Sequence, residues 1–262
     1  MNEVSERNRS IKVSAPKNFN SLLETSSRYT RSKIILALDI DYRNKTDGLL
    51  EDAKRLLELT CDRICAIKIN FHLIIPLSLS EIRELNDFAR ERHLISIADI
   101  KLNDIENTNR VATEYLWDAG FSGVIVNPFV GFEGGLDSVY KRAHELGKGV
   151  ISLAYMSHLG AEEGYGLQLK DGRLVFDLMI DRANSWGSDG VVLGTTRPDK
   201  IQMAKNKLKP EITIICPGSG AQGGNARLAL EAGADYLILG RSVVSSPEPR
   251  AAIKEAFRTL FP

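Results

Sequence analysis

Hydrophobic residues along the chain gather in eight short, nearly uninterrupted runs. The runs occupy residues 33–39, 64–70, 94–99, 123–128, 149–155, 190–194, 212–218 and 236–240. They are rich in β-branched residues, and continuous apolarity rather than alternation is typical of strands covered on both faces. Each run is therefore predicted to form a buried strand.

Amphipathic segments lie between these runs. In residues 46–60, 78–93, 107–120 and 134–149, apolar residues recur at spacings of three and four, which is typical of helices with one buried face. Alternating strands and helices indicate an α/β fold. Eight such units in 262 residues favour a closed (β/α)8 barrel, the TIM barrel, over an open doubly wound sheet.

Two segments lie outside the repeat. Residues 1–32 form a polar N-terminal extension, which we expect to be partly disordered or to contain a short helix that covers the bottom of the barrel. Residues 33–262 are expected to form a single catalytic barrel domain. The connection over residues 155–175 is long and rich in glycine, which favours a lid over the strand ends, with a purely structural loop as the alternative.

Composition narrows the range of partners. The 34 basic residues balance the 34 acidic ones, so no global field favours nucleic acid, and a small molecule is the expected partner. Cys61, Cys65 and Cys216 lack paired spacing and are interpreted as reduced core thiols. The N-terminus lacks the apolar core of a signal peptide, and no run approaches the roughly 20 residues that span a bilayer. The sequence therefore predicts a cytoplasmic protein without a membrane segment.

Polar side chains stand where the predicted strands end. They are Asp39, Lys68, Asp99, Lys101, Asn127 and Ser157. Active sites of this fold lie at the C-terminal ends of the strands, so these side chains are expected to converge on one cavity. On a regular strand, Asp99 and Lys101 would project to the same side. A row of alternating acids and bases keeps its lysines protonated, which favours proton transfer and electrostatic chemistry.

The last two strand ends predict a phosphate site. The seventh run leads into "PGSGAQGG", which begins at Pro217, and the eighth ends at Gly240 and Arg241. Glycines let backbone amides approach a ligand, and the loops after strands seven and eight hold phosphate in many barrels. A flexible loop beside a surface arginine is the alternative. The sequence offers neither a serine–histidine nucleophile pair nor a cluster of metal ligands.

These motifs together resemble the orotidine 5′-monophosphate decarboxylase family in its short microbial form, over residues 33–249. The most specific match is Asp-x-Lys-x-x-Asp-Ile-x-x-Thr, met here by Asp99, Lys101, Asp104, Ile105 and Thr108. Supporting matches are "LALD", "IKIN", "MSHLG", "PGSGAQGG" and "LGRS". The resemblance implies a carboxy-lyase that converts orotidine 5′-monophosphate to UMP and carbon dioxide, the last step of UMP synthesis.

The resemblance also assigns roles in catalysis. It implies that Lys101 protonates C6 of the pyrimidine while Asp99 lies against the substrate carboxylate, and that no cofactor or metal takes part. Asp39 and Lys68 would hold the ribose hydroxyls, and Lys68 would complete the charged row. Asp104 would join these residues from the neighbouring chain of a homodimer, so that active sites are shared.

Further residues are implied to bind the substrate. They are Ile105 and Pro217, Thr108 across the dimer interface, Ser157 at the pyrimidine amide edge, and Gln222, Gly240 and Arg241 toward the phosphate. The chain departs from the family pattern at Asn70, where many relatives are expected to carry glycine. Two alternatives stay open: a metal-dependent sugar-phosphate decarboxylase or aldolase of the same superfamily, and a non-catalytic barrel that binds nucleotide phosphates.

Overall fold

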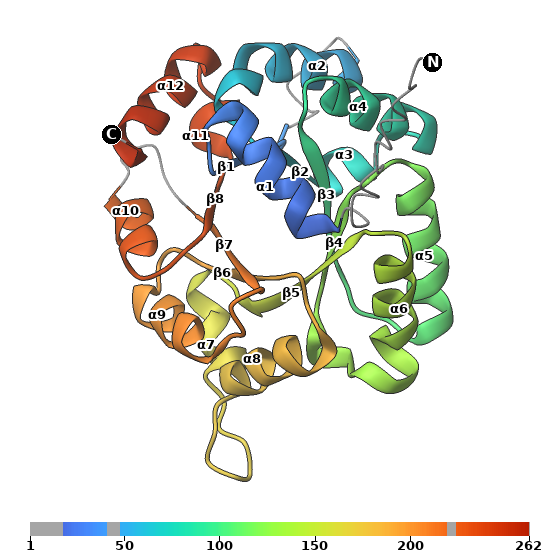
Figure 1. The fold of residues 1–262 in the computed structure, drawn as a ribbon, viewed down its shortest axis with the longest axis vertical. Helices are drawn as coiled ribbons and strands as arrows, with labels where there is room; N and C mark the ends of the chain where they lie inside the picture. The colour runs from blue at the N-terminus through green and yellow to red at the C-terminus, as the bar shows by residue number, and fades with distance from the viewer. Residues whose placement is uncertain (1–17, 41–47, 219–223, 262) are drawn as a thin grey trace, which may run out of the picture.

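The computed structural model describes residues 18–40, 48–218 and 224–261, without the side chains of residues 224 and 225. Eight parallel strands close into a barrel in chain order, as Figure 1 shows. The strands are β1 (Ile34–Ala37), β2 (Ala66–Asn70), β3 (Ile95–Leu102), β4 (Gly123–Val126), β5 (Gly149–Tyr155), β6 (Gly190–Leu193), β7 (Thr213–Pro217) and β8 (Tyr236–Leu239). The structure confirms the predicted TIM barrel.

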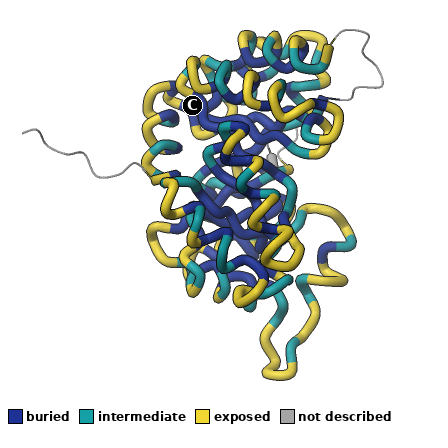
Figure 2. The backbone as a smooth tube through the Cα atoms, turned by 90° about the vertical axis from the view of Figure 1, so that its right-hand side faces the viewer, coloured by how far each residue is buried: buried dark blue, intermediate teal, exposed yellow. Residues whose placement is uncertain are grey.

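Helices surround the barrel. They are α2 (Leu49–Thr60), α3 (Phe71–Ile74), α4 (Leu79–Glu91), α5 (Glu106–Asp118), α6 (Asp137–Glu145), α7 (Glu162–Tyr165), α8 (Val175–Trp186), α9 (Pro198–Lys207), α10 (Gly224–Glu231), α11 (Arg241–Val244) and α12 (Pro249–Leu260). Figure 2 shows the buried strands inside the exposed outer turns of the chain. None of the helices in the described ranges is long and apolar enough to cross a membrane.

Alternating residues of each strand face the interior and the helices. In β1, Ile34 and Leu36 belong to the cluster beneath the helices, whereas Ile35 and Ala37 belong to the cluster inside the barrel. Because side chains alternate with a period of two, this register also determines which polar residues point inward. Lys68 follows the inward-facing Ala66 by two positions, and Asp99 and Asp39 likewise follow inward-facing residues by two.

Helix α1 (Phe19–Thr30) closes one end of the barrel, which faces the viewer in Figure 1. Its side chains Phe19 and Leu23 are fully buried within the interior cluster. A Cβ at Gly123 or Gly149 would lie only 2.8 or 2.3 Å from atoms of Phe19, so glycine at the start of β4 and β5 makes room for the ring. The short helix expected in this segment is present. The domain boundary at residue 32 stays a prediction.

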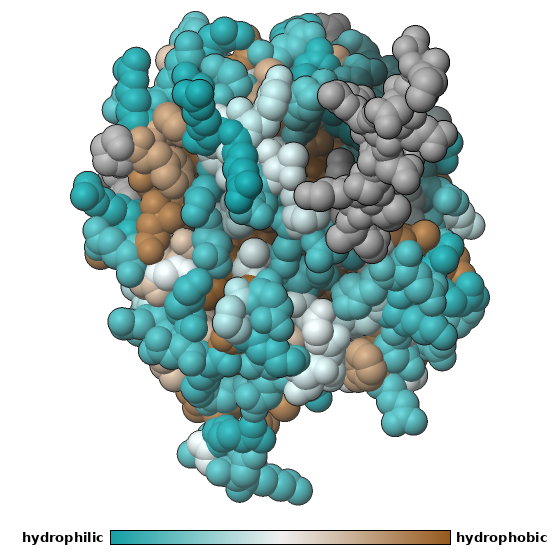
Figure 3. Space-filling model, in the orientation of Figure 1, coloured by the Kyte–Doolittle hydropathy of each residue, from teal (hydrophilic) through white to brown (hydrophobic). Residues whose placement is uncertain are grey.

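The face covered by α1 is largely hydrophilic, with hydrophobic residues visible in separate places (Figure 3). The long connection after β5 contains a short 3-10 turn, Leu159–Ala161, and then α7. Beyond α7 it forms a loop that projects from the body of the barrel, and an antiparallel bridge between Gln168 and Leu174 closes this loop. Cys65 and Cys216 are buried and Cys61 is partly buried, and all three are free thiols.

Candidate active site

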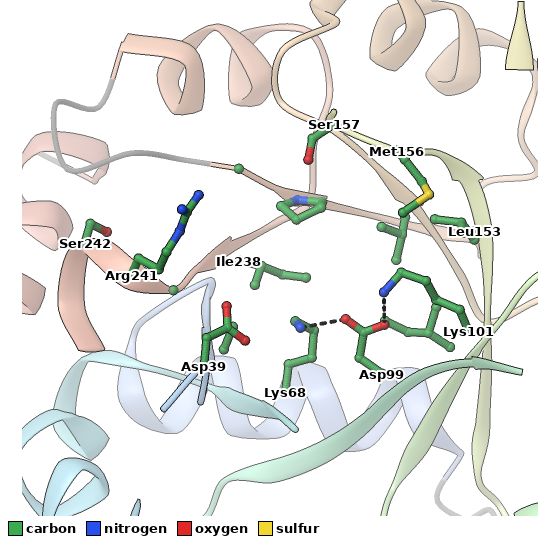
Figure 4. Close-up of a pocket in the computed structure, with 16 residues that line it drawn as sticks. Asp39, Lys68, Asp99, Lys101, Leu153, Met156, Ser157, Ile238, Arg241 and Ser242 are labelled. Atoms are coloured by element: carbon green, nitrogen blue, oxygen red, sulfur yellow. Dashed lines mark hydrogen bonds and ion pairs between the residues drawn. The ribbon is translucent and has the colours of Figure 1, made fainter. Parts of the chain in front are cut away.

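A cavity of about 640 Å³ opens at the C-terminal ends of the strands. Its polar lining comprises Asp39, Lys68, Asp99, Lys101, Ser157, Arg241 and Ser242, and the backbone of Pro217, Gly218 and Gly240 adjoins it. Figure 4 shows the lysine–aspartate row along one side and Arg241 at the opposite end. The structure therefore brings together the charged residues that the sequence placed at separate strand ends.

The carboxylate of Asp99 lies between two ammonium groups. Lys68 Nζ donates to Asp99 Oδ2 at 2.6 Å, and Lys101 Nζ donates to Asp99 Oδ1 at 2.7 Å. The side chains of Lys68 and Asp99 are only 7% and 9% exposed, whereas that of Lys101 is 37% exposed. Burial by itself would raise the pKa of Asp99, but the two ammonium groups outweigh it and hold this pKa below its ordinary value.

Lys101 reaches this position by an irregular route. The pairing of β3 with β4 shifts register between Ala98 and Leu102, and Lys101 has a φ of 46°, in the left-handed region. The strand is therefore not the regular one that the prediction assumed, yet Asp99 and Lys101 both line the cavity. A non-glycine residue at positive φ is strained, and such strain is common at functional sites.

Asp39 lies just beyond β1 and beside Gly240. A Cβ at Gly240 would be 2.9 Å from Asp39 Oδ2, so glycine leaves space for the carboxylate. Its other oxygen, Oδ1, accepts a hydrogen bond from Asn70 Nδ2 at 2.7 Å. Two polar strand ends thus meet at this side of the cavity.

On the opposite side of the cavity, two glycines allow close packing and a tight turn of the backbone. A Cβ at Gly194 would lie 2.7 Å from Cα and Cβ of Ser157, which shows how closely the chains after β5 and β6 approach each other. Gly218 has a φ of 102°, a conformation that favours glycine, at the point where β7 ends. Gln222, which the sequence placed in this loop, lies outside the described residues.

Asp104, Ile105 and Thr108 do not line the cavity of their own chain. They lie at the start of α5, and all three are exposed. Ile105 keeps 66% of its surface exposed, which is unusual for a large aliphatic side chain. The fold therefore separates these three members of the motif from Asp99 and Lys101.

Asn127 is not part of the cavity lining, contrary to the expected convergence of all the strand-end polar residues. Its side chain instead accepts from the backbone N–H of Phe129 at 3.1 Å, in a turn after β4. Sequence reasoning also missed the apolar wall of the cavity. That wall includes Ile125, Leu153, Met156, Val192 and Ile238. Alternation along the strands is the signal that could have identified most of it.

Within the described ranges, no group of three or more histidine, cysteine, aspartate or glutamate residues is arranged to hold a metal ion. The closed barrel and the ion-paired row at its C-terminal rim place the chain in the class of (β/α)8-barrel enzymes. Residues 32–256 match the model of the "Orotidine 5'-phosphate decarboxylase / HUMPS family". The chain belongs to this family.

Individual relatives agree with this assignment. Orotidine 5′-phosphate decarboxylase of Pyrococcus abyssi is 39% identical over 224 residues, which cover 86% of this chain and 97% of the relative. The enzyme of Pyrococcus furiosus is 40% identical over 227 residues, 87% and 97% of the two chains.

Solved structures are similar as well. The crystal structure of orotidine 5′-phosphate decarboxylase from Pyrococcus horikoshii has a TM-score of 0.71 and 37% identity, covering 87% of this chain and 99% of that one. The enzyme from Methanocaldococcus jannaschii, complexed with the inhibitor BMP, has a TM-score of 0.74 and 29% identity, covering 88% and 99%.

Proposed function

We propose that this cavity decarboxylates orotidine 5′-monophosphate with Lys101 as the proton donor. The chain is a carboxy-lyase of pyrimidine nucleotide synthesis, and its reaction yields UMP and carbon dioxide. The bond between C6 and the carboxylate carbon breaks, its electron pair stays on C6, and the Lys101 ammonium delivers a proton there. The observation that carries this proposal is the Asp99 carboxylate held between Lys68 and Lys101.

Asp99 and the apolar wall explain how this arrangement favours the transition state. Asp99 keeps its charge in a nearly buried position, so it lies ready to repel a substrate carboxylate placed against it. As carbon dioxide leaves, that repulsion is relieved, and the ammonium of Lys101 stabilises the charge that develops at C6. Side chains such as Ile125 and Leu153 exclude water, which strengthens both effects.

The rest of the cavity binds the nucleotide. Asp39 and Lys68 take the ribose hydroxyls, and Ser157 takes the amide edge of the pyrimidine. At the opposite end, Arg241 binds the phosphate with Gly240 and the loop from Pro217 to Gln222. The guanidinium of Arg241 supports this orientation, because its donors match phosphate oxygens and it stands at the far end of the cavity from Lys101.

We further propose that two chains share their active sites. Asp104, Ile105 and Thr108 are exposed on their own chain, and α5 also exposes the large side chains of Val111 and Tyr115. Exposed apolar side chains next to motif residues favour contact with a second copy, because association would bury them. In that dimer, Asp104 and Thr108 reach the ribose bound by the partner.

We also propose a cytoplasmic location. The free thiols of Cys61, Cys65 and Cys216 fit this location, because the cytoplasm keeps cysteines reduced.

The test is the loss of orotidine 5′-monophosphate ultraviolet absorbance, measured with and without a chelator. We expect equal turnover in both samples. Turnover that the chelator abolishes and a divalent cation restores would contradict the metal-free reaction. Chelator-sensitive turnover of a sugar phosphate, with none of orotidine 5′-monophosphate, would favour the metal-dependent sugar-phosphate class. Tight UMP binding without turnover in either sample would indicate a non-catalytic binding barrel.

A further inference from the structure

The side chain of Asn70, the last residue of β2, connects two strand ends at the edge of the cavity. Its Nδ2 donates to Asp39 Oδ1 at 2.7 Å, and its Oδ1 accepts from the backbone N–H of His72 at 2.9 Å. The Nδ1 atom of the His72 ring also lies 2.7 Å from this oxygen. Asn70 therefore anchors the Asp39 carboxylate to the first turn of α3.

The partners determine the orientation of this amide. A backbone N–H can only donate and an ionised carboxylate can only accept, so the amide oxygen faces His72 and the amide nitrogen faces Asp39. Turning the amide over would break both hydrogen bonds and set its oxygen against the carboxylate. A hydrogen bond to an ionised acceptor is also among the stronger kinds. The contact therefore favours the orientation that the Asp39 carboxylate has in the structure.

Asn70 reaches the cavity only through Asp39, because Asp39 belongs to the cavity lining and Asn70 does not. Asp39 and Lys68 both point into the cavity from adjacent strand ends (Figure 4). In the described part of the chain they form no ion pair, and the Lys68 ammonium is bound to Asp99 instead. The hydrogen bond from Asn70 thus keeps the Asp39 carboxylate from pairing with a lysine on the adjacent strand, to which it is electrostatically attracted.

We propose that Asn70 is a positioning residue for substrate recognition, which holds the Asp39 carboxylate ready for a ribose hydroxyl and away from Lys68. This inference rests on the proposed role of Asp39 in binding the ribose. Without the amide, Asp39 would turn toward the Lys68 ammonium and compete with Asp99 for it. The substrate would then have to displace that contact, so KM would rise more than kcat falls.

A double-mutant cycle tests the inference, with kcat and KM measured for orotidine 5′-monophosphate. In the parent protein, Asn70→Ala should lower kcat/KM about tenfold, the effect of one hydrogen bond to a charged group. In an Asp39→Ala background, the same substitution should change kcat/KM by less than about twofold, because the group that Asn70 positions is gone. An equal loss in both backgrounds would show that Asn70 acts independently of Asp39, and the inference would be wrong.

A second variant separates positioning from folding. Asn70→Asp keeps an oxygen for the His72 backbone N–H but replaces the donor with a second carboxylate. It should lower kcat/KM more than Asn70→Ala does, and this loss should also disappear in the Asp39→Ala background. The test therefore holds even if the alanine variant is unstable, which thermal melting would reveal. A full loss that persists without Asp39 would overturn the inference.

Asn127 offers a matched control. It also follows a strand, and its side chain accepts from a backbone N–H two residues on. It does not line the cavity, and among the described residues it forms no hydrogen bond with a carboxylate. Asn127→Ala should leave kcat/KM unchanged, and a loss equal to that of Asn70→Ala would contradict the inference. The Asp39→Ala variant by itself tests the underlying assignment. Full activity in that single variant would refute the proposed role of Asp39. Because Asn70 is unchanged in this variant, the result tests the role of Asp39 separately from that of Asn70.

Discussion

The two ends of the barrel interior are occupied by different kinds of side chain. At the end under α1, the interior is filled by the fully buried Phe19 and Leu23. At the other end, the interior positions carry the ion-paired Lys68 and Asp99. Burial of the apolar side chains Phe19 and Leu23 stabilises the fold, because it removes apolar surface from water. Buried ions lose their hydration, and only their attraction to each other compensates for that loss. One end therefore stabilises the fold and the other supports chemistry.

The largest expected effect is the loss of turnover in Lys101→Ala. Removing a proton donor that acts only in the transition state should lower kcat by at least about 10³-fold. The variant should still fold and bind UMP, because Lys101 is partly exposed and lies at the functional end. Spectrophotometric kinetics and a UMP titration measure both. The exposed Lys170 is the control, and its replacement by alanine should leave kcat unchanged. Near wild-type turnover would remove Lys101 from the proposed role.

The second expected effect tests whether Lys101 of one chain and Asp104 of its partner form one active site. Lys101→Ala and Asp104→Ala should each be nearly inactive as homodimers. In a hybrid dimer, one site collects both defects, while the other takes Lys101 and Asp104 from the chains that retain them and is intact. Activity should therefore rise after subunit exchange, toward one working site per hybrid.

Exchange in that experiment must be followed directly, for example with mass-tagged chains. Each variant incubated alone is the control, and it should stay at its initial activity. If hybrids form and the activity of the mixture does not rise, Asp104 serves its own chain and the shared site is wrong.

At the end of the barrel closed by α1, a substitution should lower the stability of the fold and leave kcat unchanged. Phe19→Ala removes a fully buried ring from the barrel interior and should lower the free energy of unfolding by about 3–5 kcal/mol. Denaturant unfolding measures this, and kcat of the folded fraction should stay near the parent value. Tyr29 lies on the same helix but is 65% exposed, so Tyr29→Ala is a matched control with a much smaller expected loss. Equal losses of unfolding free energy in the two variants would contradict the proposed role of Phe19 in closing the barrel.

The smallest expected effect is at the phosphate end. Arg241→Ala should weaken substrate binding by about 1.5–3 kcal/mol, the range for a lost hydrogen bond to a charged group. Orotidine, which lacks the phosphate, should be bound and turned over by the variant as it is by the parent. Competition assays with UMP and uridine measure the same difference without turnover. Equal losses with and without phosphate would mean that Arg241 acts on the fold.

Much of this molecule could be predicted from local pattern. Continuous apolar runs identified the strands, and helical spacing between them identified the barrel, because burial on both faces restricts residue type along a strand. The spacing of Asp99 and Lys101 next to a strand end identified the centre of the site. Strands, helices and this motif can be predicted from the sequence because they depend on residues that are close together along the chain.

Only the tertiary structure decided which strand ends meet and how. Closure of the barrel places Gly240 against Asp39, although they lie at opposite ends of the chain. The pairing of β3 with β4 shifts register between Ala98 and Leu102, and within this irregular stretch Lys101 forms its hydrogen bond with Asp99. Asn70 and Asn127 have the same side chain at the same kind of strand end, yet within the described part of the chain only Asn70 donates to a carboxylate. These outcomes depend on packing between distant segments, which residue type and spacing along the chain do not encode.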